Sequence, residues 1–228
     1  MSLILGFDTS SNSSSVAISR GQHILAFYEE LRPHMQAEQI LILIEKALHK
    51  IGRSYRDLDY LVTTCGPGSF TGIRIGLATA VGIRIAAPNI KDFSVSNFEL
   101  SHYRALEQIF EYDRIIILLN AYRNQIYLQE FGRNQQPKDP QLLDIEEVLE
   151  MLKSSPKNTT IAGNALQILA GELHKFEHLI VLPRFPRVKA VHLCRYADEC
   201  IKSGKKLRPL QPLYIRPPDA KISAKKLS

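Results

Sequence analysis

Apolar residues fall into short runs along the first thirty positions, and polar turns separate these runs. The run 3–7 ends at Asp8, and the runs 16–18 and 23–28 follow it across turns of small polar residues. Short apolar runs that are bounded by polar or glycine-containing turns are typical of β-strands. We therefore expect the chain to open with an antiparallel meander of three strands.

Helical spacing alternates with strand-like runs over the rest of the chain. Ser96 with Glu99, and Asp144 with Glu147, have the spacing of capping boxes, which mark helix starts. Helices are predicted at 35–51, 72–86, 96–110, from Asp144, at 164–175 and around His192 to about Lys202, and strands at 60–65, 114–119, from 126 and at 159–162. This alternation predicts an α/β protein.

The order of strand, polar turn and return strand occurs a second time in the second half of the chain. Aligning the two openings places Asn120 opposite Asp8, each at the end of an apolar strand. Such a repeat indicates two related lobes, although two apolar strands can also resemble each other by chance. We expect one lobe at 1–105 and a second at 106–206, with the tail 207–228 returning to the first.

Two neighbouring helices carry more apolar residues than one buried face needs. The helix at 35–51 contains five consecutive aliphatic residues at 40–44, and the helix at 72–86 is apolar nearly all round. Such helices either lie deep in a large core or expose a patch for a partner, and in a small lobe we favour the partner. The predicted contact residues are Ile40, Leu41, Leu43, Ile44, Ala47, Gly72, Ile73, Gly76, Leu77, Ala80 and Arg84.

The composition is that of a globular protein rather than a disordered or membrane-spanning one. Of 228 residues, 45% are hydrophobic and 23% are charged, which is too apolar for a disordered chain. The N-terminus lacks the basic flank and the apolar length of a signal peptide. Three cysteines without C-x-x-C spacing disfavour a disulfide framework and a structural zinc site, and they indicate a reducing compartment. We expect a cytoplasmic protein without a membrane association.

The net charge of +6 comes from the C-terminal end of the chain. Residues 184–228 contain twelve Lys and Arg against three Asp and Glu, which gives +9, so the preceding residues carry −3. A basic segment of this kind either contacts an acidic partner such as nucleic acid or is a solvated face.

Asp8 and the hydroxyl-rich turn that follows it could hold a phosphate and a magnesium ion. Hydroxyls and turn amides cradle an anion, while the carboxylate binds a metal-bound water. The second lobe offers an amide at Asn120 and only one glycine, Gly163, where an adenosine site would need two. Asp8, Ser10, Asn120 and Gly163 therefore form a degenerate nucleotide site, and we expect no cofactor. The alternatives are a small-molecule kinase or ATPase of the actin-like class, or a polar hairpin turn without a ligand.

The most distinctive motif is the glycine-rich loop 66–72, which lies between a predicted strand and a predicted helix. Its loop residues are Gly66, Pro67, Gly68, Ser69, Phe70 and Thr71. The spacing matches neither a Walker loop nor a dinucleotide fingerprint, and Ser69 is not in a Gly-x-Ser-x-Gly elbow. A catalytic serine is therefore not expected here.

A metallopeptidase is a weaker alternative. His34 and Glu38 share a helix face, but the H-E-x-x-H arrangement would need a second histidine and a glutamate between the two. We expect no metal ligand at His34, and we expect Cys65 to be a buried packing residue.

The run GPGSFTGIRIG at 66–76, together with ILGFDTSSNSSSVAIS at 4–19, resembles the TsaB (YeaZ) family, and the likeness extends over the full length. The resemblance implies an actin-like ATPase (ASKHA/RNase H-like) fold and a non-catalytic subunit of the synthase that makes N6-threonylcarbamoyladenosine (t6A) at position 37 of tRNA. It implies pairing with a TsaD-like catalytic subunit through the helices at 35–51 and 72–86, and recruitment of a TsaE-like ATPase. Alone, the same surface is expected to form a homodimer.

The sequence leaves open whether tRNA touches this chain. The family's Asp-Ala-Arg in the second hairpin is here Asn120-Ala121-Tyr122-Arg123, which weakens a nucleotide-binding role further.

Overall fold

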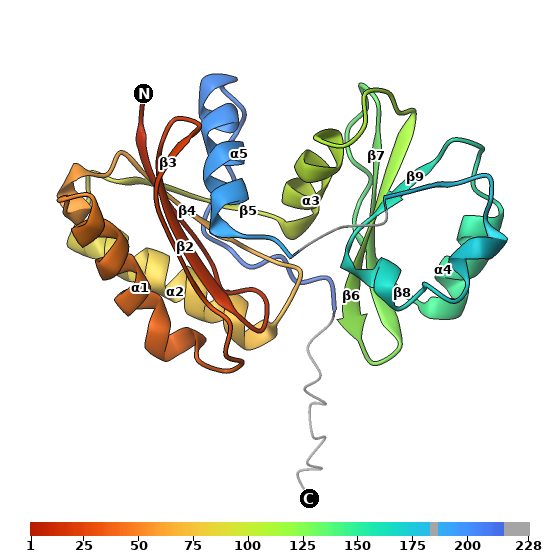
Figure 1. Ribbon diagram of the computed structural model, residues 1–228, viewed down its shortest axis with the longest axis horizontal. Helices are drawn as coiled ribbons and strands as arrows, with labels where there is room; N and C mark the ends of the chain where they lie inside the picture. The colour runs from red at the N-terminus through yellow and green to blue at the C-terminus, as the bar shows by residue number, and fades with distance from the viewer. Residues whose placement is uncertain (183–186, 217–228) are drawn as a thin grey trace, which may run out of the picture.

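Two five-stranded sheets form the framework of the protein, as seen in a computed structural model that describes residues 1–182 and 187–216 (Figure 1). The first sheet has the order β3-β2-β1-β4-β5 and the second the order β8-β7-β6-β9-β10. The first contains β1 (Leu3–Asp8), β2 (Ser14–Arg20), β3 (His23–Glu30), β4 (Tyr60–Thr64) and β5 (Lys91–Val95). The second contains β6 (Arg114–Tyr122), β7 (Gln125–Gly132), β8 (Gln141–Asp144), β9 (Thr160–Ala162) and β10 (Ile180–Val181). The predicted α/β architecture of two duplicated lobes is confirmed, because the two sheets have the same topology.

Five α-helices within the described ranges cover the faces of the sheets. They are α1 (Gln36–Lys50), α2 (Phe70–Ala86), α3 (Asn97–Leu106), α4 (Ile145–Lys153) and α5 (Ala190–Lys202). Figure 1 shows α1 and α2 on the outer side of the first sheet, α4 on the outer side of the second, and α5 and α3 between the sheets. None of the helices in the described ranges is long and apolar enough to cross a membrane.

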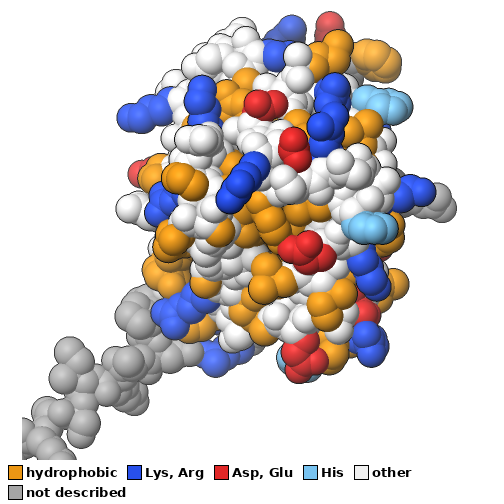
Figure 2. All heavy atoms as spheres, turned by 90° about the vertical axis from the view of Figure 1, so that its left-hand side faces the viewer, with side chains coloured by type: hydrophobic (Ala, Val, Ile, Leu, Met, Phe, Trp, Pro, Cys, Tyr) orange, Lys and Arg blue, Asp and Glu red, His pale blue; other side chains and the backbone are white. Residues whose placement is uncertain are grey.

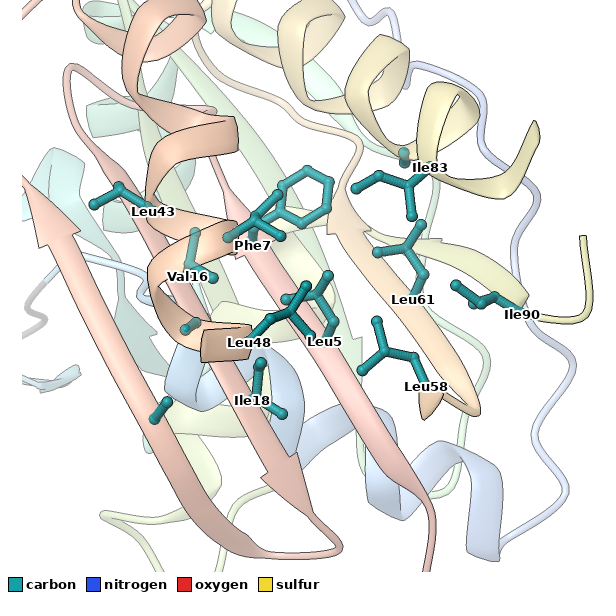
Figure 3. Packing of buried hydrophobic residues seen from close by; sticks show 14 of the residues in the cluster. Leu5, Phe7, Val16, Ile18, Leu43, Leu48, Leu58, Leu61, Ile83 and Ile90 are labelled. Atoms are coloured by element: carbon teal, nitrogen blue, oxygen red, sulfur yellow. The ribbon is translucent and has the colours of Figure 1, made fainter. Parts of the chain in front are cut away.

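Alternation along β1 gives the first lobe two separate cores. Leu5 and Phe7 point to the outer side, where they pack with residues of α1 and α2 such as Ile44 and Ile83 (Figure 3). Ile4 points to the opposite side and packs against α5. Successive side chains of a strand alternate between the two faces of its sheet, so a strand that is buried on both faces reads as one continuous apolar run.

The second sheet is covered in the same way but with less helix. Ile116 and Leu118 of β6 pack against α4 on one face. Ile115 and Ile117 pack on the other face against Phe98 of α3. Of the inner helices, α5 packs on the first sheet, whereas α3 contacts the second sheet through Phe98 and the core beneath α5 through Leu100.

The packing of α5 differs from the division that the sequence suggested. Residues 190–202 fall within the predicted lobe 106–206, yet they contact β1 and β2 of the first sheet. The first sheet needs them there because its inner face is apolar. In the order of the chain the second sheet is thus inserted between α3 and α5, and in space both helices lie between the two sheets (Figure 1).

The region after β9 contradicts the predicted helix at 164–175. It forms two short 3-10 turns, Asn164–Gln167 and Leu173–Lys175. Gly171 interrupts the segment, and the side chain of Asn164 accepts a hydrogen bond from the Asn120 N–H at 2.8 Å instead of starting a long helix. Glycine is among the poorest helix formers.

Several smaller boundaries also differ from the prediction. α2 begins at Phe70 rather than Gly72, because the Ser69 hydroxyl accepts a hydrogen bond from the Gly72 N–H and acts as the N-cap. α3 ends at Leu106 rather than near 110. The strands β5, β8 and β10 were not predicted. The helix starts at Ser96 and Asp144 are confirmed, since both residues form capping boxes.

The described part of the tail, 207–216, contacts both lobes. It pairs with β5 where the Ser94 N–H donates to the Arg208 carbonyl at 2.9 Å. The Leu213 N–H then donates to the Cys65 carbonyl at 2.8 Å. Arg216 ends the segment on the second lobe with a hydrogen bond to the Ala121 carbonyl at 3.0 Å. Residues 217–228 of the predicted returning tail lie outside the described ranges.

Candidate functional site

A cleft of about 940 Å³ separates the two lobes. Its walls come from the end of β1, the loop before α2, the first turns of α3, the end of β6 and the tail segment 213–216. The structure therefore brings Asp8, Ser10 and Asn120 of the predicted nucleotide site into one cavity. Gly163 does not line this cavity, and its neighbour Asn164 lines it instead.

Asp8 lies on the first-lobe wall of the cleft and is only 1% exposed. One of its carboxylate oxygens, Oδ1, accepts hydrogen bonds from the Ser10 N–H at 3.1 Å, the Ser10 hydroxyl at 2.6 Å and the Thr64 hydroxyl at 2.5 Å. Burial raises the pKa of Asp8, and the three hydrogen bonds oppose that shift without cancelling it. This carboxyl group is thus held by its own lobe.

The glycine-rich loop packs against the turn between β1 and β2. The Ser69 N–H donates to the Ser10 carbonyl at 2.7 Å. A Cβ on Gly68 would lie 2.4 Å from the same carbonyl oxygen, so this backbone approach admits no side chain. The amide of Asn97 closes the arrangement by donating to the Pro67 carbonyl at 2.7 Å and to the Ser10 hydroxyl at 2.8 Å.

The same close approach continues into the first turns of α2. A Cβ on Gly72 would lie 2.0 Å from the Thr9 carbonyl oxygen, and one on Gly76 would lie 2.6 Å from the Thr9 hydroxyl oxygen. The Thr9 hydroxyl donates to the Gly72 carbonyl at 2.7 Å. The glycines of this motif therefore let α2 lie directly on the first hairpin, which is a packing role rather than a phosphate cradle.

The corresponding residues of the second lobe also have local roles. The Asn120 side-chain oxygen accepts from the Tyr122 N–H at 2.7 Å, which supports the turn into β7. Gly163 has φ +125°, and a Cβ there would lie 2.0 Å from the Leu118 carbonyl oxygen. Asn120 and Gly163 thus shape the backbone beside the cleft.

Most of the predicted partner-binding residues lie inside the first lobe, and this corrects the sequence-based interpretation. Leu41 and Arg84 are exposed. The remaining nine are buried in the chain itself: Ile40, Leu43, Ile44, Ala47, Gly72, Ile73, Gly76, Leu77 and Ala80. The physical reason is that the outer face of the first sheet and the first hairpin require two apolar, closely approaching helices of their own.

A different set of apolar side chains on α1 and α2 faces the solvent. Leu41 is 51% exposed, Ile42 is 45% exposed and Ile85 is 74% exposed. Figure 2, which views this side of the molecule, shows hydrophobic side chains gathered across the middle of the face, with charged residues around them. We call Leu41, Ile42 and Ile85 the outer apolar patch. The sequence signal for this patch was the pair Leu41–Ile42, which lies between the buried residues Ile40 and Leu43 on the same helix.

The other candidate chemistry does not assemble into a site. His34 is exposed before α1, and the described residues contain no group of three or more His, Cys, Asp and Glu side chains that could hold a metal ion. Cys65, Cys194 and Cys200 are free and buried. Burial raises the pKa of Cys65, as expected for a packing residue.

Comparisons with known proteins agree on one family. A family model described as "TsaD: tRNA N6-adenosine threonylcarbamoyltransferase" matches residues 31–188. The tRNA threonylcarbamoyladenosine biosynthesis protein TsaB of Buchnera aphidicola subsp. Schizaphis graminum is 27% identical over 195 residues, which covers 83% of this chain and 90% of that protein.

Solved structures agree on the fold. YeaZ from Pseudomonas aeruginosa superposes with a TM-score of 0.74 at 22% identity, and the match covers 94% of this chain and 100% of that one. A Bacteroides thetaiotaomicron protein with an actin-like ATPase fold and unknown function has a TM-score of 0.51 at 10% identity, over 85% of this chain and 95% of that one. The predicted actin-like ATPase fold is confirmed. The match of the family model to more than half of the chain, together with the TsaB relatives, shows that the chain belongs to the TsaB (YeaZ) family, within the broader family that the TsaD model describes.

Proposed function

We propose that this chain is a non-catalytic subunit of the assembly that makes t6A at position 37 of tRNA. In this role it binds and activates a TsaD-like catalytic subunit and helps to recruit a TsaE-like ATPase. Relatives that are named tRNA threonylcarbamoyladenosine biosynthesis protein TsaB support the pathway, and such a role places the chain in the cytoplasm.

The outer apolar patch is the observation that carries the proposed partner contact. Ile85 exposes 74% of its surface, and Leu41 and Ile42 expose about half of theirs. Leu41 and Ile42 lie in the first half of α1 and Ile85 lies at the end of α2, so both outer helices expose aliphatic side chains that burial against a partner would cover. Arg84, which lies 3.6 Å from Asp92 in an ion pair, supplies a charged rim beside the patch. We propose that the catalytic subunit covers this face.

The state of the cleft supports the non-catalytic part of the proposal. Asp8 is the one carboxylate among the described residues that line the cleft, and its Oδ1 already accepts three hydrogen bonds. The opposite wall carries the amide Asn120, which binds a cation less well than a carboxylate does. A second acidic group for phosphoryl transfer is therefore not offered by the described walls.

Reconstitution with a TsaD-like and a TsaE-like subunit tests the proposal. Ile42→Glu and Ile85→Glu place a charge in the outer apolar patch, and we expect each to weaken co-purification with the catalytic subunit at least about tenfold and to reduce t6A formation in parallel. Ile168→Glu is the matched control, because Ile168 is 45% exposed, as Ile42 is, but lies on the second lobe.

The same variants test self-association. Without its partner the wild-type chain is expected to form a homodimer through the patch, with a light-scattering mass that falls on dilution, whereas the two patch variants are expected to remain monomeric. Equal t6A formation with and without this chain would refute the subunit role. Unchanged co-purification of both variants would refute the patch as the contact surface.

A small-molecule kinase or ATPase is the second candidate, and the size of the cleft beside Asp8 favours it. Tight binding of magnesium–ATP in calorimetry, abolished by Asp8→Ala, would support this candidate. We expect no such binding, because the second wall of the cleft lacks the acidic group.

A further inference from the structure

Exposed aromatic rings gather around the mouth of the inter-lobe cleft. Phe70 is 53% exposed, Tyr122 is 61% exposed and Tyr214 is 52% exposed, and all three line the cavity. Of the large hydrophobic residues in the described part of the chain, only two other aromatic ones, Phe27 and Phe110, are exposed. The three rings come from α2, from the hairpin of the second lobe and from the tail, so three separate segments place an aromatic face at the same opening.

Arginines accompany these rings on both walls. Arg74, Arg123, Arg187 and Arg216 line the cleft, and Asp8 is the only acidic side chain among its described lining residues. A cleft that is lined by one sign of charge focuses the electrostatic field and concentrates ligands of the opposite sign. Arg187 forms an ion pair with Glu29, but the other three arginines outnumber Asp8, so the described lining still favours an anionic ligand.

Arg74 shows how the rings and the charges combine. Its guanidinium carbon lies 3.8 Å from the centroid of the Phe70 ring, and its Nε donates to the Tyr214 hydroxyl at 3.1 Å. The two rings are 5.8 Å apart with an angle of 34° between their planes. This stack is ordered before any ligand arrives, and its hydrogen bond uses only one of the guanidinium N–H groups.

Deeper in the cleft, two buried polar groups lack partners among the described residues. They are the hydroxyl of Ser101, a residue that is 1% exposed, and the side-chain oxygen of Asn97, a residue that is 7% exposed. Both residues line the cavity. Buried polar atoms are nearly always hydrogen-bonded in native proteins, so these two atoms point to a ligand that brings its own polar groups.

We propose that the inter-lobe cleft binds a segment of single-stranded RNA. Its bases stack on Phe70, Tyr122 and Tyr214, and its phosphates lie near the arginines of both walls. Base edges or ribose hydroxyls reach Ser101 and Asn97. Aromatic side chains read splayed, unpaired bases, whereas a duplex hides the base faces. The inference goes beyond the proposed subunit role, because it assigns an RNA contact to this chain itself.

The position of the rings favours a strand over a free nucleotide. A small-molecule site encloses about 70–90% of its ligand, but these rings stand at the rim and each exposes about half of its surface. They are spread over both lobes, so that one strand could pass from one ring to the next. A free nucleotide has a single base and would leave two of the three rings uncovered.

Fluorescence anisotropy with the isolated chain of 228 residues tests the proposal. The probe is a fluorescein-labelled single-stranded RNA of about 12 nucleotides and mixed sequence, and the comparison is the same sequence as a duplex. We expect the single strand to bind more tightly than the duplex. Raising the salt from roughly 50 to 200 mM should weaken binding steeply, since phosphate contacts release counterions.

Two variants with matched controls locate the site. Tyr122→Asn removes a ring at φ +57°, a backbone conformation that asparagine tolerates, and should weaken binding about 5- to 100-fold. Its control is Phe110→Asn, which removes an exposed ring outside the cleft. Arg74→Gln should weaken binding by a similar factor and flatten the salt dependence. Its control is Arg56→Gln, which changes an exposed arginine of the first lobe that lies outside the cleft. We expect both controls to bind as the wild type does.

Ultraviolet cross-linking of the wild-type chain gives an independent measurement. Cross-linked peptides that contain Tyr122 or Tyr214 are the expected result. Equal binding of duplex and single strand, or full binding by both cleft variants, would overturn the proposal. A triple variant with Lys221, Lys225 and Lys226 changed to Gln gives a third outcome: loss of RNA binding in this variant but not in the cleft variants would also overturn the proposal. Binding of adenosine nucleotides without binding of RNA would overturn it as well. These readouts use no other subunit, so they are separate from the failure of co-purification that would refute the proposed function.

Discussion

The two lobes share a strand order but differ in what covers their outer faces. The first sheet carries α1 and α2, of 15 and 17 residues, whereas the second carries α4, of 9 residues, and short 3-10 turns. The order of strands is preserved because it fixes the backbone hydrogen bonds of both sheets. The covering layers differ, and the two outer helices of the first lobe expose Leu41, Ile42 and Ile85.

The two hairpins differ in a complementary way. The turn after Asp8 is largely buried under the glycine-rich loop and α2, with Thr9 and Ser10 almost inaccessible. The turn after Asn120 projects into solvent, and its three residues 122–124 have positive φ. One hairpin has therefore become a packing element and the other a carrier of exposed side chains. Equivalent positions in a duplicated fold need not keep equivalent tasks.

The largest expected change in unfolding free energy comes from a substitution on α2. Gly76→Arg forces a long charged side chain against Thr9 and Thr63, and we expect a loss of more than about 4 kcal/mol of unfolding free energy. Gly82→Arg places the same side chain on the same helix where a Cβ meets nothing within 4 Å. It should stabilise the protein by about 0.5 kcal/mol through helix propensity.

Urea denaturation that is followed by circular dichroism measures both effects. Equal stabilities of the two variants would mean that α2 does not pack on the first hairpin as described. The comparison of the lobes would then lose its main contrast.

The inner helices allow a sharper comparison, because each carries one half-buried histidine. Burial, with a smaller contribution from Lys205, lowers the pKa of His102 on α3 from 6.5 to about 4. Burial and the nearby Arg104 lower the pKa of His192 on α5 to about 4 as well. In both cases the folded protein favours the neutral ring. The stabilisation is thus fully present above pH 6.5 and is lost as the pH falls towards 4.

His102→Phe should remove the contribution of His102 to the loss of unfolding free energy between pH 6.5 and pH 4. The ring of His102 stacks on Phe131 with centroids 4.2 Å apart, so a phenyl ring can keep the contact. At pH 5 we expect the variant to exceed the wild type by on the order of 1 kcal/mol, a figure that is reduced because His102 is partly solvated. Thermal unfolding at pH 7 and pH 5 gives the difference, and parallel pH curves for the two proteins would contradict the expectation.

The elements that could be predicted from the sequence are those that a few adjacent residues determine. The strand at 3–7 and the capping box at Ser96 are properties of a few adjacent residues, and both were predicted. The segment 164–175 was wrong, because the side chain of Asn164 serves a neighbouring strand that local spacing does not reveal.

The predicted contact residues failed for a related reason. A glycine stripe indicates close backbone approach, but it does not tell whether the approaching backbone belongs to a partner or to Thr9 of the same chain. A site at Asp8, Ser10 and Asn120 was predicted because Asp8 and Asn120 follow equivalent apolar strands and Ser10 lies in the turn after Asp8. The arginines and aromatic rings at its mouth come from segments far apart in the sequence, and no local pattern joins them.

The smallest effects are expected where the two hairpins begin. Burial raises the pKa of Asp8, so above the ordinary value of 3.8 the folded state retains a proton longer than the unfolded state, and stability falls as the pH rises through that range. Asp8→Asn removes this dependence while its oxygen can still accept the three hydrogen bonds. We expect it to be more stable than the wild type at pH 7, by on the order of 1 kcal/mol.

Asn120→Asp, the reverse change on the second hairpin, should alter stability by less than about 0.5 kcal/mol, because Asn120 is partly exposed and either side chain can accept from the Tyr122 N–H. Urea midpoints at pH 4 and pH 7 separate the two cases. A destabilised Asp8→Asn at pH 7 would show that the carboxylate charge itself is needed in the first hairpin.

The position of α5 has a consequence for how the chain matures during synthesis. The inner face of the first sheet, with Ile4, Ala17 and Val62, is closed by a helix that is made only after the whole second sheet. At roughly 5–20 residues per second, translation leaves that apolar face uncovered for several seconds while the second lobe emerges. The nascent first lobe therefore exposes this apolar face until residues 190–202 have left the ribosome, and its inner core is completed only then.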